Sequence, residues 1–270
     1  MRIPKLFSIL LALVYATTAL AAGEDDLRAP NSVAIPLRPP GKAEAVGYRE
    51  ADSTLVIPAS VTALPPFCLA GCEGLKRVEF APGSRCRGIG EYCFAECIDL
   101  EEIILPVSLA ELGEGVFREC RALKRLNLPA GITRLPKEMC HRCIALEEIA
   151  LPASLREISS FALAGCEALR ELNIPAGVTK IGSNAFSLCR SITEAVVPAG
   201  VISLESYAFA GCESLRRLTL PKRQDMLGEL IVADCPSLVE IMEPAAVPPV
   251  FDCMSFLFEP DDLTAYNRCT

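Results

Sequence analysis

The stretch SNAFSLC, residues 183–189, has two close relatives in the same chain: SFALAGC at 160–166 and SYAFAGC at 206–212. Each contains an apolar pair, two further residues and a cysteine, and the three copies start 23 residues apart, at residues 160, 183 and 206. A fixed period of this length is typical of repeat proteins, in which every repeat forms one unit that packs on its neighbours. The period therefore predicts a solenoid.

A recurring proline shows how far the repeat extends. From Pro106 onward the prolines follow one another at intervals of 23 residues, and the repeat before Pro106 has one extra residue near RCRG, residues 85–88. Eight repeats of about 23 residues therefore cover residues 58–243. We number the positions in each repeat from its proline, position 0, and leave the extra residue uncounted. The eight prolines are Pro58, Pro82, Pro106, Pro129, Pro152, Pro175, Pro198 and Pro221.

The segment LRELNIP, residues 169–175, predicts a strand at the end of each repeat. Its apolar residues at positions 20 and 22 alternate with polar ones, as on a strand with one buried face. The next proline ends the strand, because it has no N–H to donate and keeps the preceding residue extended. Positions 6–14, as in IGSNAFSLC, are too few for a long helix, and we expect one or two helical turns there.

A single repeat of this size cannot bury enough apolar surface to offset the entropy lost on ordering it. Stacked repeats bury their apolar positions against neighbours on both sides. The fold expected from the pattern is an α/β solenoid with a parallel β-sheet on one face and short helical turns on the other.

The pattern Leu-x-x-Ile-x-Ile-Pro, then Val or Ile, then Ile-Gly-x-x-Ala-Phe-x-x-Cys-x-x-Leu resembles the BspA-like leucine-rich repeat family. The resemblance implies a leucine-rich-repeat solenoid that is exported or attached to the surface of a host-associated microbe. It also implies protein–protein recognition through the sheet face, with adhesion to host matrix or cell-surface proteins as the family theme. A structural scaffold of the cell envelope, with no dedicated ligand, is the alternative.

The two ends of the chain differ from the repeats. Residues 1–21 resemble a secretory signal peptide, with Arg2 and Lys5 before an apolar run and small residues at its end. A membrane anchor is the alternative, although the apolar run is short for a bilayer span. We expect residues 22–57 to form an N-terminal extension with a capping strand, and residues 244–270 to form a C-terminal capping segment. After removal of the signal, no segment is long and apolar enough to span a membrane.

The charge balance restricts the class of partner. The chain has 26 basic and 34 acidic side chains, a formal charge of −8, and loss of Arg2 and Lys5 with the signal leaves 24 − 34 = −10. We therefore expect no nucleic-acid partner, since affinity for nucleic acid depends on basic patches. We expect a protein partner, a secreted or cell-surface location, a monomeric state and no cofactor.

The chain has 14 cysteines, and most of them occur at position 14, where we expect buried free thiols. Two pairs, Cys68 with Cys72 and Cys93 with Cys97, have spacings that suit zinc. Cys68 and Cys93 occupy position 10, where other repeats have apolar residues. Three roles are therefore possible for them: packing in the core, a disulfide between neighbouring repeats, or a metal site. Outside the repeats, Cys253 and Cys269 could form a disulfide.

The sequence contains two features that could indicate catalysis, and neither gives it much support. CHRC at 140–143 resembles a redox motif, but Cys140 occupies the position that Phe186 and Phe209 occupy in other repeats. His141, the sole histidine of the sequence, neighbours no nucleophilic serine motif and is expected on a solvated turn. The sequence therefore predicts a protein that is not an enzyme.

Positions 18, 19 and 21 should be exposed on the sheet face, and their charges alternate between basic and acidic repeats in the first half of the array. Glu148, Glu171 and Glu194 break this order, because they place three acids in register. Like charges opposite one another are destabilising unless something cationic binds them. A salt-bridge ladder and a protein-binding surface both fit the pattern. The candidate binding residues are Glu148, Glu171, Glu194, Asn127, Asn173, Arg125 and Arg217.

Overall fold

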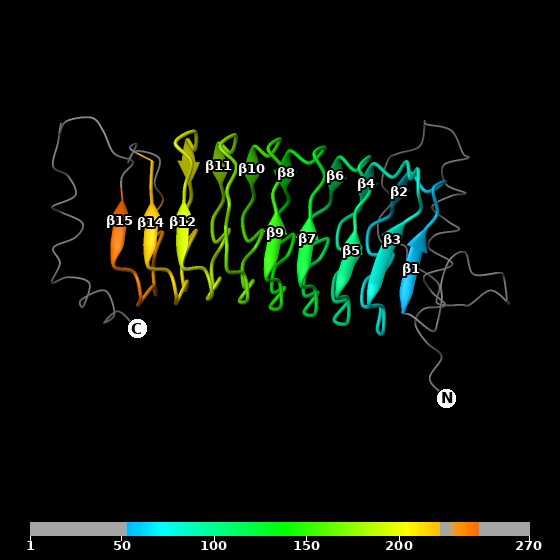
Figure 1. Cartoon of the computed structure of the whole chain (residues 1–270), viewed down its shortest axis with the longest axis horizontal. Coiled ribbons are helices and arrows are strands. Elements are labelled where there is room, and N and C mark those ends of the chain that lie inside the picture. Colours follow the sequence, from blue (N-terminus) through cyan, green and yellow to red (C-terminus); the bar gives the residue numbers. More distant parts are fainter. Residues whose placement is uncertain (1–52, 222–227, 229, 243–270) are drawn as a thin grey trace, which may run out of the picture.

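The computed structural model describes residues 53–221, 228 and 230–242, and over this range the chain is an elongated stack of coils. Short strands stand side by side along the stack in two layers (Figure 1). Every strand pairing is parallel, and each coil contributes its strands to the same two layers. The prediction of about eight stacked repeats with a parallel sheet is confirmed.

The first layer, here called the front sheet, contains the strands at the end of each repeat. Its strands pair in register, so that position 19 of one coil lies beside position 19 of the next, as Arg125 lies beside Glu148. The rung at Leu172 is reduced to a single bridge to Ala195, and the sheet is interrupted there. The strands are β1 (Thr54–Ile57), β3 (Arg77–Phe80), β5 (Glu102–Ile104), β7 (Arg125–Asn127), β9 (Glu148–Ala150), β12 (Glu194–Val196), β14 (Arg217–Thr219) and β15 (Glu240–Met242).

The second layer, the back sheet, lies at positions 5 and 6. Position 6 carries an aliphatic residue that points into the core, as do Leu135 and Ile158, which pair with each other in register. The back sheet is interrupted between β6 and β8. Its strands are β2 (Ala63–Leu64), β4 (Gly88–Ile89), β6 (Glu111–Leu112), β8 (Arg134–Leu135), β10 (Glu157–Ile158), β11 (Lys180–Ile181) and β13 (Ser203–Leu204).

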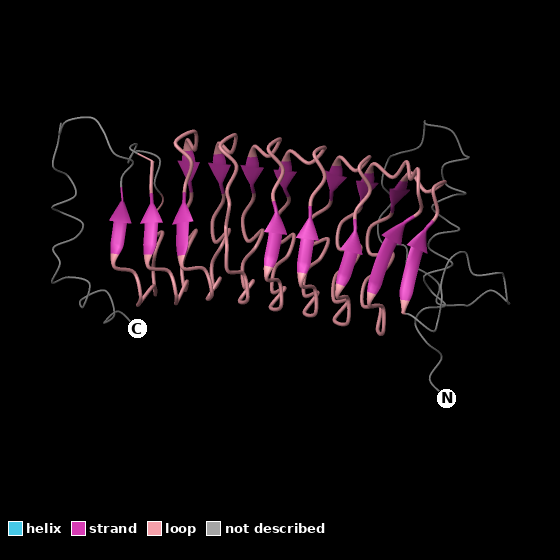
Figure 2. Cartoon of the chain, viewed as in Figure 1, coloured by secondary structure: helices cyan, strands magenta, loops and turns pink. Residues whose placement is uncertain are grey.

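The prediction of helical turns is wrong, since the residues that the structure describes contain no helix (Figure 2). Positions 8–14 form instead a third side, the turn face. Positions 9 and 13 have positive φ in every coil, for example Asn184 at 56° and Leu188 at 58°. Left-handed residues four apart interrupt any helix.

Backbone hydrogen bonds show what replaces the helix. The N–H of Phe186 donates to Ala208 of the next coil at 2.9 Å, whereas the N–H of its neighbour Ser187 donates within the coil to Asn184. Alternate N–H groups therefore bind the next coil and the same coil, which satisfies the backbone without a helix.

The core runs along the centre of the stack. The apolar pair at positions 10 and 11 is buried as expected, and its phenylalanines stack from coil to coil, with ring centroids 5.2 Å apart for Phe186 and Phe209. The position-14 cysteines line the same core. From Cys97 to Cys235, seven of them donate S–H to the position-11 carbonyl of the preceding coil, at 3.0–3.3 Å.

Candidate functional site

The front sheet presents one flat row of side chains per strand. In β7, Leu126 is buried while Arg125 and Asn127 on either side of it are exposed. Alternation of this kind follows from the pleat of a strand with one face on the core. The outward positions 18, 19 and 21 therefore form a continuous surface along the stack, here called the front face.

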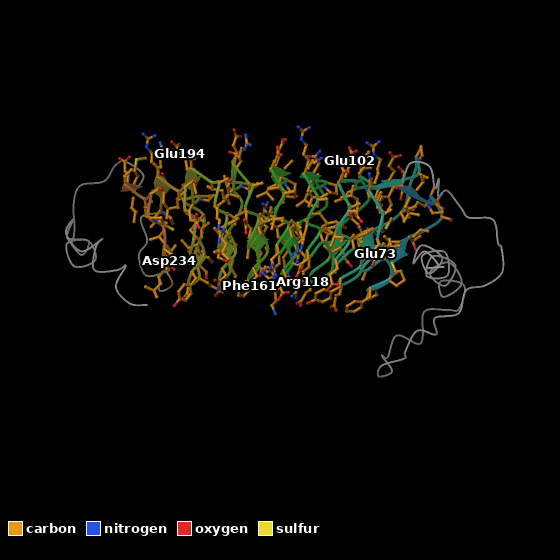
Figure 3. All side chains as sticks on the ribbon, turned by 90° about the horizontal axis from the view of Figure 1, so that it is seen from below. Glu73, Glu102, Arg118, Phe161, Glu194 and Asp234 are labelled. Atoms are coloured by element: carbon orange, nitrogen blue, oxygen red, sulfur yellow. The ribbon has the colours of Figure 1, made fainter. Side chains whose placement is uncertain are left out.

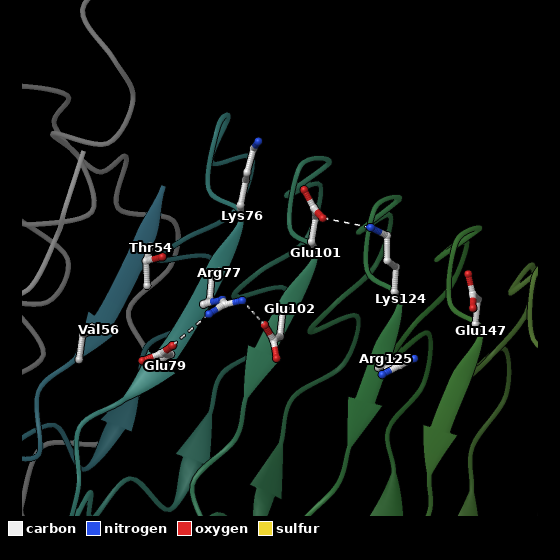
Figure 4. Close-up of a pocket in the computed structure, with 10 residues that line it drawn as sticks. All are labelled: Thr54, Val56, Lys76, Arg77, Glu79, Glu101, Glu102, Lys124, Arg125 and Glu147. Carbon is white, nitrogen blue, oxygen red and sulfur yellow. Dashed lines mark hydrogen bonds and ion pairs between the residues drawn. The ribbon is translucent and has the colours of Figure 1, made fainter. Parts of the chain in front are cut away.

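The front face is hollowed over its first five rungs. The hollow has a volume of about 890 Å³ and is formed by strands β1, β3, β5 and β7 and by the residue that precedes β9 (Figure 4). Its lining holds four basic and four acidic side chains, so its formal charges cancel. The lining residues are Thr54, Val56, Lys76, Arg77, Glu79, Glu101, Glu102, Lys124, Arg125 and Glu147.

Ion pairs join neighbouring rungs of the hollow. Arg77 binds Glu102 at 2.7 Å, and Lys124 binds Glu101 at 3.1 Å. The hydrogen bond from Lys124 and its charge hold the pKa of Glu101 below its usual range. These side chains are about half exposed, so water and salt screen each pair and it adds little to the free energy of unfolding. Their main consequence is that they fix the positions of the charges on the face.

Two charged residues of the lining take no part in ion pairs among the described residues. Lys76 and Glu147 form no ion pair with any other described residue. In Figure 4 the Lys76 side chain extends away from the sheet, and Glu147 follows Lys124 on the next rung. These charges are open to a partner.

The seven candidate residues from the sequence all lie exposed on the front face, but only Arg125 lines the hollow. The alternation of basic and acidic rungs is confirmed by contacts: Arg125 binds Glu148 at 3.7 Å, and Arg217 binds both Glu194 at 3.0 Å and Glu240 at 3.3 Å. Two of the three stacked acids thus have basic partners.

Glu171 is the exception among the three stacked acids. It forms no ion pair with another residue that the structure describes, and its neighbour Leu172 makes the single bridge at which the front sheet is interrupted. Asn173, on the same rung, is also exposed. The interruption of the sheet and the break in the charge alternation therefore fall on one rung.

Position 21 shows a second alternation, which our sequence analysis missed. Polar residues there alternate with apolar ones on successive rungs, and Ile104 and Val196 are 52% and 58% exposed. The apolar residues fall on the acidic rungs, so the surface repeats every two coils. The signal was present in the sequence, in the series Glu79, Ile104, Asn127, Ala150, Asn173, Val196, Thr219 and Met242.

The turn face lies on the opposite side of the stack. Figure 3 shows Glu102 and Glu194 on one side and Arg118 and Phe161 on the other. Arg118 binds Glu138 at 2.7 Å on this face. His141 is half-buried against the edge of Phe161, not fully solvated as expected, and burial and the charge of Arg118 lower its pKa.

The cysteines have no disulfide among the twelve that the structure describes. Cys140 and Cys143 of the CHRC motif are both fully buried, which keeps an external substrate from them and argues against the redox interpretation. The described part of the chain also contains no group of three or more ligating side chains that could hold a metal ion. Cys253 and Cys269 lie outside the described residues.

Comparison with known proteins shows which family the repeats belong to. Residues 48–152 and 134–250, well over half of the chain, match the family described as the BspA type leucine rich repeat region, with six copies. This chain belongs to that family. No curated protein matches the sequence.

Solved structures of bacterial leucine-rich repeat proteins are similar to this one. A leucine rich cell surface protein from Faecalibacterium prausnitzii has 27% identity and a TM-score of 0.53, over 70% of this chain and 60% of that one. The leucine rich repeat protein of T. pallidum has 21% identity and a TM-score of 0.43, over 73% of this chain and 78% of that one. The chain thus spans less than two thirds of the Faecalibacterium protein.

No described segment of this BspA-type chain has a helix that could cross a membrane. The predicted signal peptide, residues 1–21, lies outside the described residues.

Proposed function

We propose that this BspA-type protein is exported or displayed at the cell surface and recognises another protein through its front face. The observation that carries the proposal is the hollow over β1–β9, in which basic and acidic side chains alternate from rung to rung and two ion pairs fix four of the eight charges. A protein partner with complementary charges would make many modest contacts there, which favours specificity and fast association.

Other observations support recognition rather than chemistry. The face is open and formed by paired strands, and every second rung carries an exposed apolar side chain at position 21, which a partner could cover. Repeat proteins use extended surfaces of this kind for binding. Because the charges in the hollow cancel, the pattern of charge and not its net sign would select the partner.

The proposed cell-surface location and adhesive role need support other than the fold. The description of the Faecalibacterium protein as a cell surface protein supports the location. Adhesion to a host or neighbouring-cell protein follows as the role that suits an exported binding surface. A scaffold of the cell envelope is the rival function, and it would need no partner on the front face.

The proposal is tested with the mature chain as bait for host matrix and surface proteins. A second bait carries Lys76→Glu and Glu147→Lys, which reverse the two lining charges that have no ion pair to lose. We expect the first bait to retain a partner and the second to lose it. Equal recovery on both baits, or protection of the native protein from protease added to whole cells, would contradict the proposal.

A further inference from the structure

The first two coils bring two thiols into contact. The Sγ atoms of Cys68 and Cys93 lie 3.3 Å apart, and both residues occupy position 10 of their repeats. Backbone hydrogen bonds fix this register, because the N–H groups of Phe67 and Leu69 donate to the carbonyls of Glu91 and Cys93 at 2.9 Å. Later coils have Val116, Ala162 and other non-cysteine residues at this position.

From this geometry we propose that Cys68 and Cys93 form a disulfide that joins the first coil of the solenoid to the second. Coils joined by such backbone hydrogen bonds lie about as far apart as neighbouring strands, about 4.8 Å, and this spacing falls within the Cα separation of about 4.4–6.8 Å that a disulfide requires. No large backbone movement is needed, since the sulfurs are already in contact.

Access distinguishes Cys68 from the other cysteines of the first two coils. Cys68 is partly exposed, whereas Cys72, Cys93 and Cys97 are buried. Cys97 donates its S–H to the carbonyl of Leu69, and the later position-14 thiols make the equivalent bond. An oxidant in solution can therefore reach Cys68 first.

The reaction is a thiol–disulfide exchange with a small-molecule disulfide such as oxidised glutathione. The thiolate of Cys68 attacks one sulfur of that disulfide, forms a mixed disulfide and releases one glutathione thiol. Cys93 then loses its proton, attacks Sγ of Cys68 and releases the second glutathione thiol. The two protein thiols supply two electrons and two protons, and both glutathione sulfurs are reduced. Burial raises the pKa of Cys93 and so disfavours its thiolate, which leaves the first attack on the oxidant to the partly exposed Cys68.

The position of the cross-link gives it a structural consequence. A terminal coil has a neighbour on one side only, so a solenoid opens first at its ends. A bond between residues 68 and 93 prevents the first coil from separating from the second. Formation of the bond in the cell depends on the proposed export, but its formation in vitro does not.

The test incubates the folded mature chain with oxidised glutathione, alkylates the free thiols after denaturation and maps the peptides without reduction. Trypsin cleaves after Lys76 and Arg87, so Cys68 stays with Cys72 on one peptide and Cys93 stays with Cys97 on the other. Single variants therefore assign the bond. We expect one cross-link between these peptides, retained in Cys72→Ser and lost in Cys68→Ser.

A further variant separates the two steps of the exchange. In Cys93→Ser the exposed Cys68 has no resolving thiol, and we expect it to accumulate as the glutathione mixed disulfide. Resistance to limited proteolysis of the first coil should fall on reduction in the wild type and stay unchanged on reduction in Cys68→Ser. Full alkylation of Cys68 and Cys93 in the oxidised wild type would overturn the proposal, as would a cross-link that survives in Cys68→Ser.

Discussion

The thiol of Cys189 donates a hydrogen bond to the backbone carbonyl of Leu163, one coil earlier, at 3.3 Å. The same carbonyl accepts the backbone N–H of Cys166 at 3.2 Å. A cysteine at position 14 is thus small enough for the core and also bonds one coil to the next. This explains why the repeat has cysteine there and not alanine, which has no donor.

Substitution of this cysteine tests its role as a donor. Cys189→Ala removes the S–H and leaves a small cavity, and we expect the free energy of unfolding to fall by about 1–2 kcal/mol. Cys189→Ser keeps a donor at the same site and should lose less. Urea denaturation measures both changes. Equal losses for the two variants would attribute the effect to packing alone.

Alkaline pH should unfold the protein through the same thiols. Burial raises the pKa of Cys189 to about 12, whereas an exposed thiol titrates near 8.5. The unfolded chain loses its thiol proton at a lower pH than the folded chain does. The contribution of the buried thiol to the free energy of unfolding is therefore fully present below about pH 8.5 and falls as the pH rises toward 12. The fall should be shallower in Cys189→Ala. A pH profile that is identical in this variant and the wild type would exclude the thiol as a cause.

Acid should weaken one contact near the back sheet. Burial alone would raise the pKa of Glu205, but hydrogen bonds from Lys180 and Ser183 outweigh it, so that the pKa lies below its usual range. This carboxylate therefore stabilises the fold above its ordinary pKa of about 4.3, and the contribution is lost as the pH falls through the lowered value. The stability difference between wild type and Glu205→Gln should be about 1 kcal/mol at pH 7 and disappear near pH 3. A difference that persists in acid would point to another contact.

Glu171 offers a substitution that should raise stability. Glu171→Arg would place a basic residue between Glu148 and Glu194 and restore the alternation of the front face. We expect a gain of about 0.5–1 kcal/mol that shrinks with added salt. Glu171→Gln removes the repulsion without adding an ion pair, and it is the control. If the arginine variant is no more stable than the glutamine variant, the ladder of charges contributes nothing at this rung.

The same position bears on binding. If the three stacked acids contact a basic partner, Glu171→Arg should weaken that contact while it stabilises the fold. Changing Glu194 instead would remove the partner of Arg217, so Glu171 is the cleaner site. Unchanged affinity in Glu171→Arg would place the partner elsewhere on the front face, over the hollow.

The sequence predicts the stacked coils and the front sheet well, because the burial of Leu126 and the exposure of Arg125 follow directly from alternation within a strand. The helical turns could not be corrected from sequence alone. Left-handed backbone at positions 9 and 13 is recognisable where glycine occurs, as at Gly115, but Tyr92 and Arg142 adopt the same conformation. Hydrogen bonds to the next coil impose it, and these exist only after stacking.

The sequence predicts only part of the candidate site on the front face. The sequence shows which residues face outward, so the alternation that pairs Arg125 with Glu148 could be read from the repeat. The hollow over the first rungs could not, because it depends on the placement of side chains such as Lys76 and Glu101 from successive strands. The exposed apolar residues at position 21, such as Ile104, could have been predicted from the sequence, because the strand pattern places position 21 on the outward face.

The most direct test of front-face recognition compares two charge swaps that each preserve an ion pair of 2.7 Å. Arg77→Glu with Glu102→Arg reverses one ion pair of the hollow, and Arg118→Glu with Glu138→Arg makes the matched change on the turn face. Both proteins should fold, and calorimetry measures their affinity for the partner recovered with the wild type. We expect the front-face swap to weaken binding by roughly tenfold or more and the turn-face swap to leave it unchanged. Loss of binding in the turn-face swap, with full affinity in the front-face swap, would contradict the account.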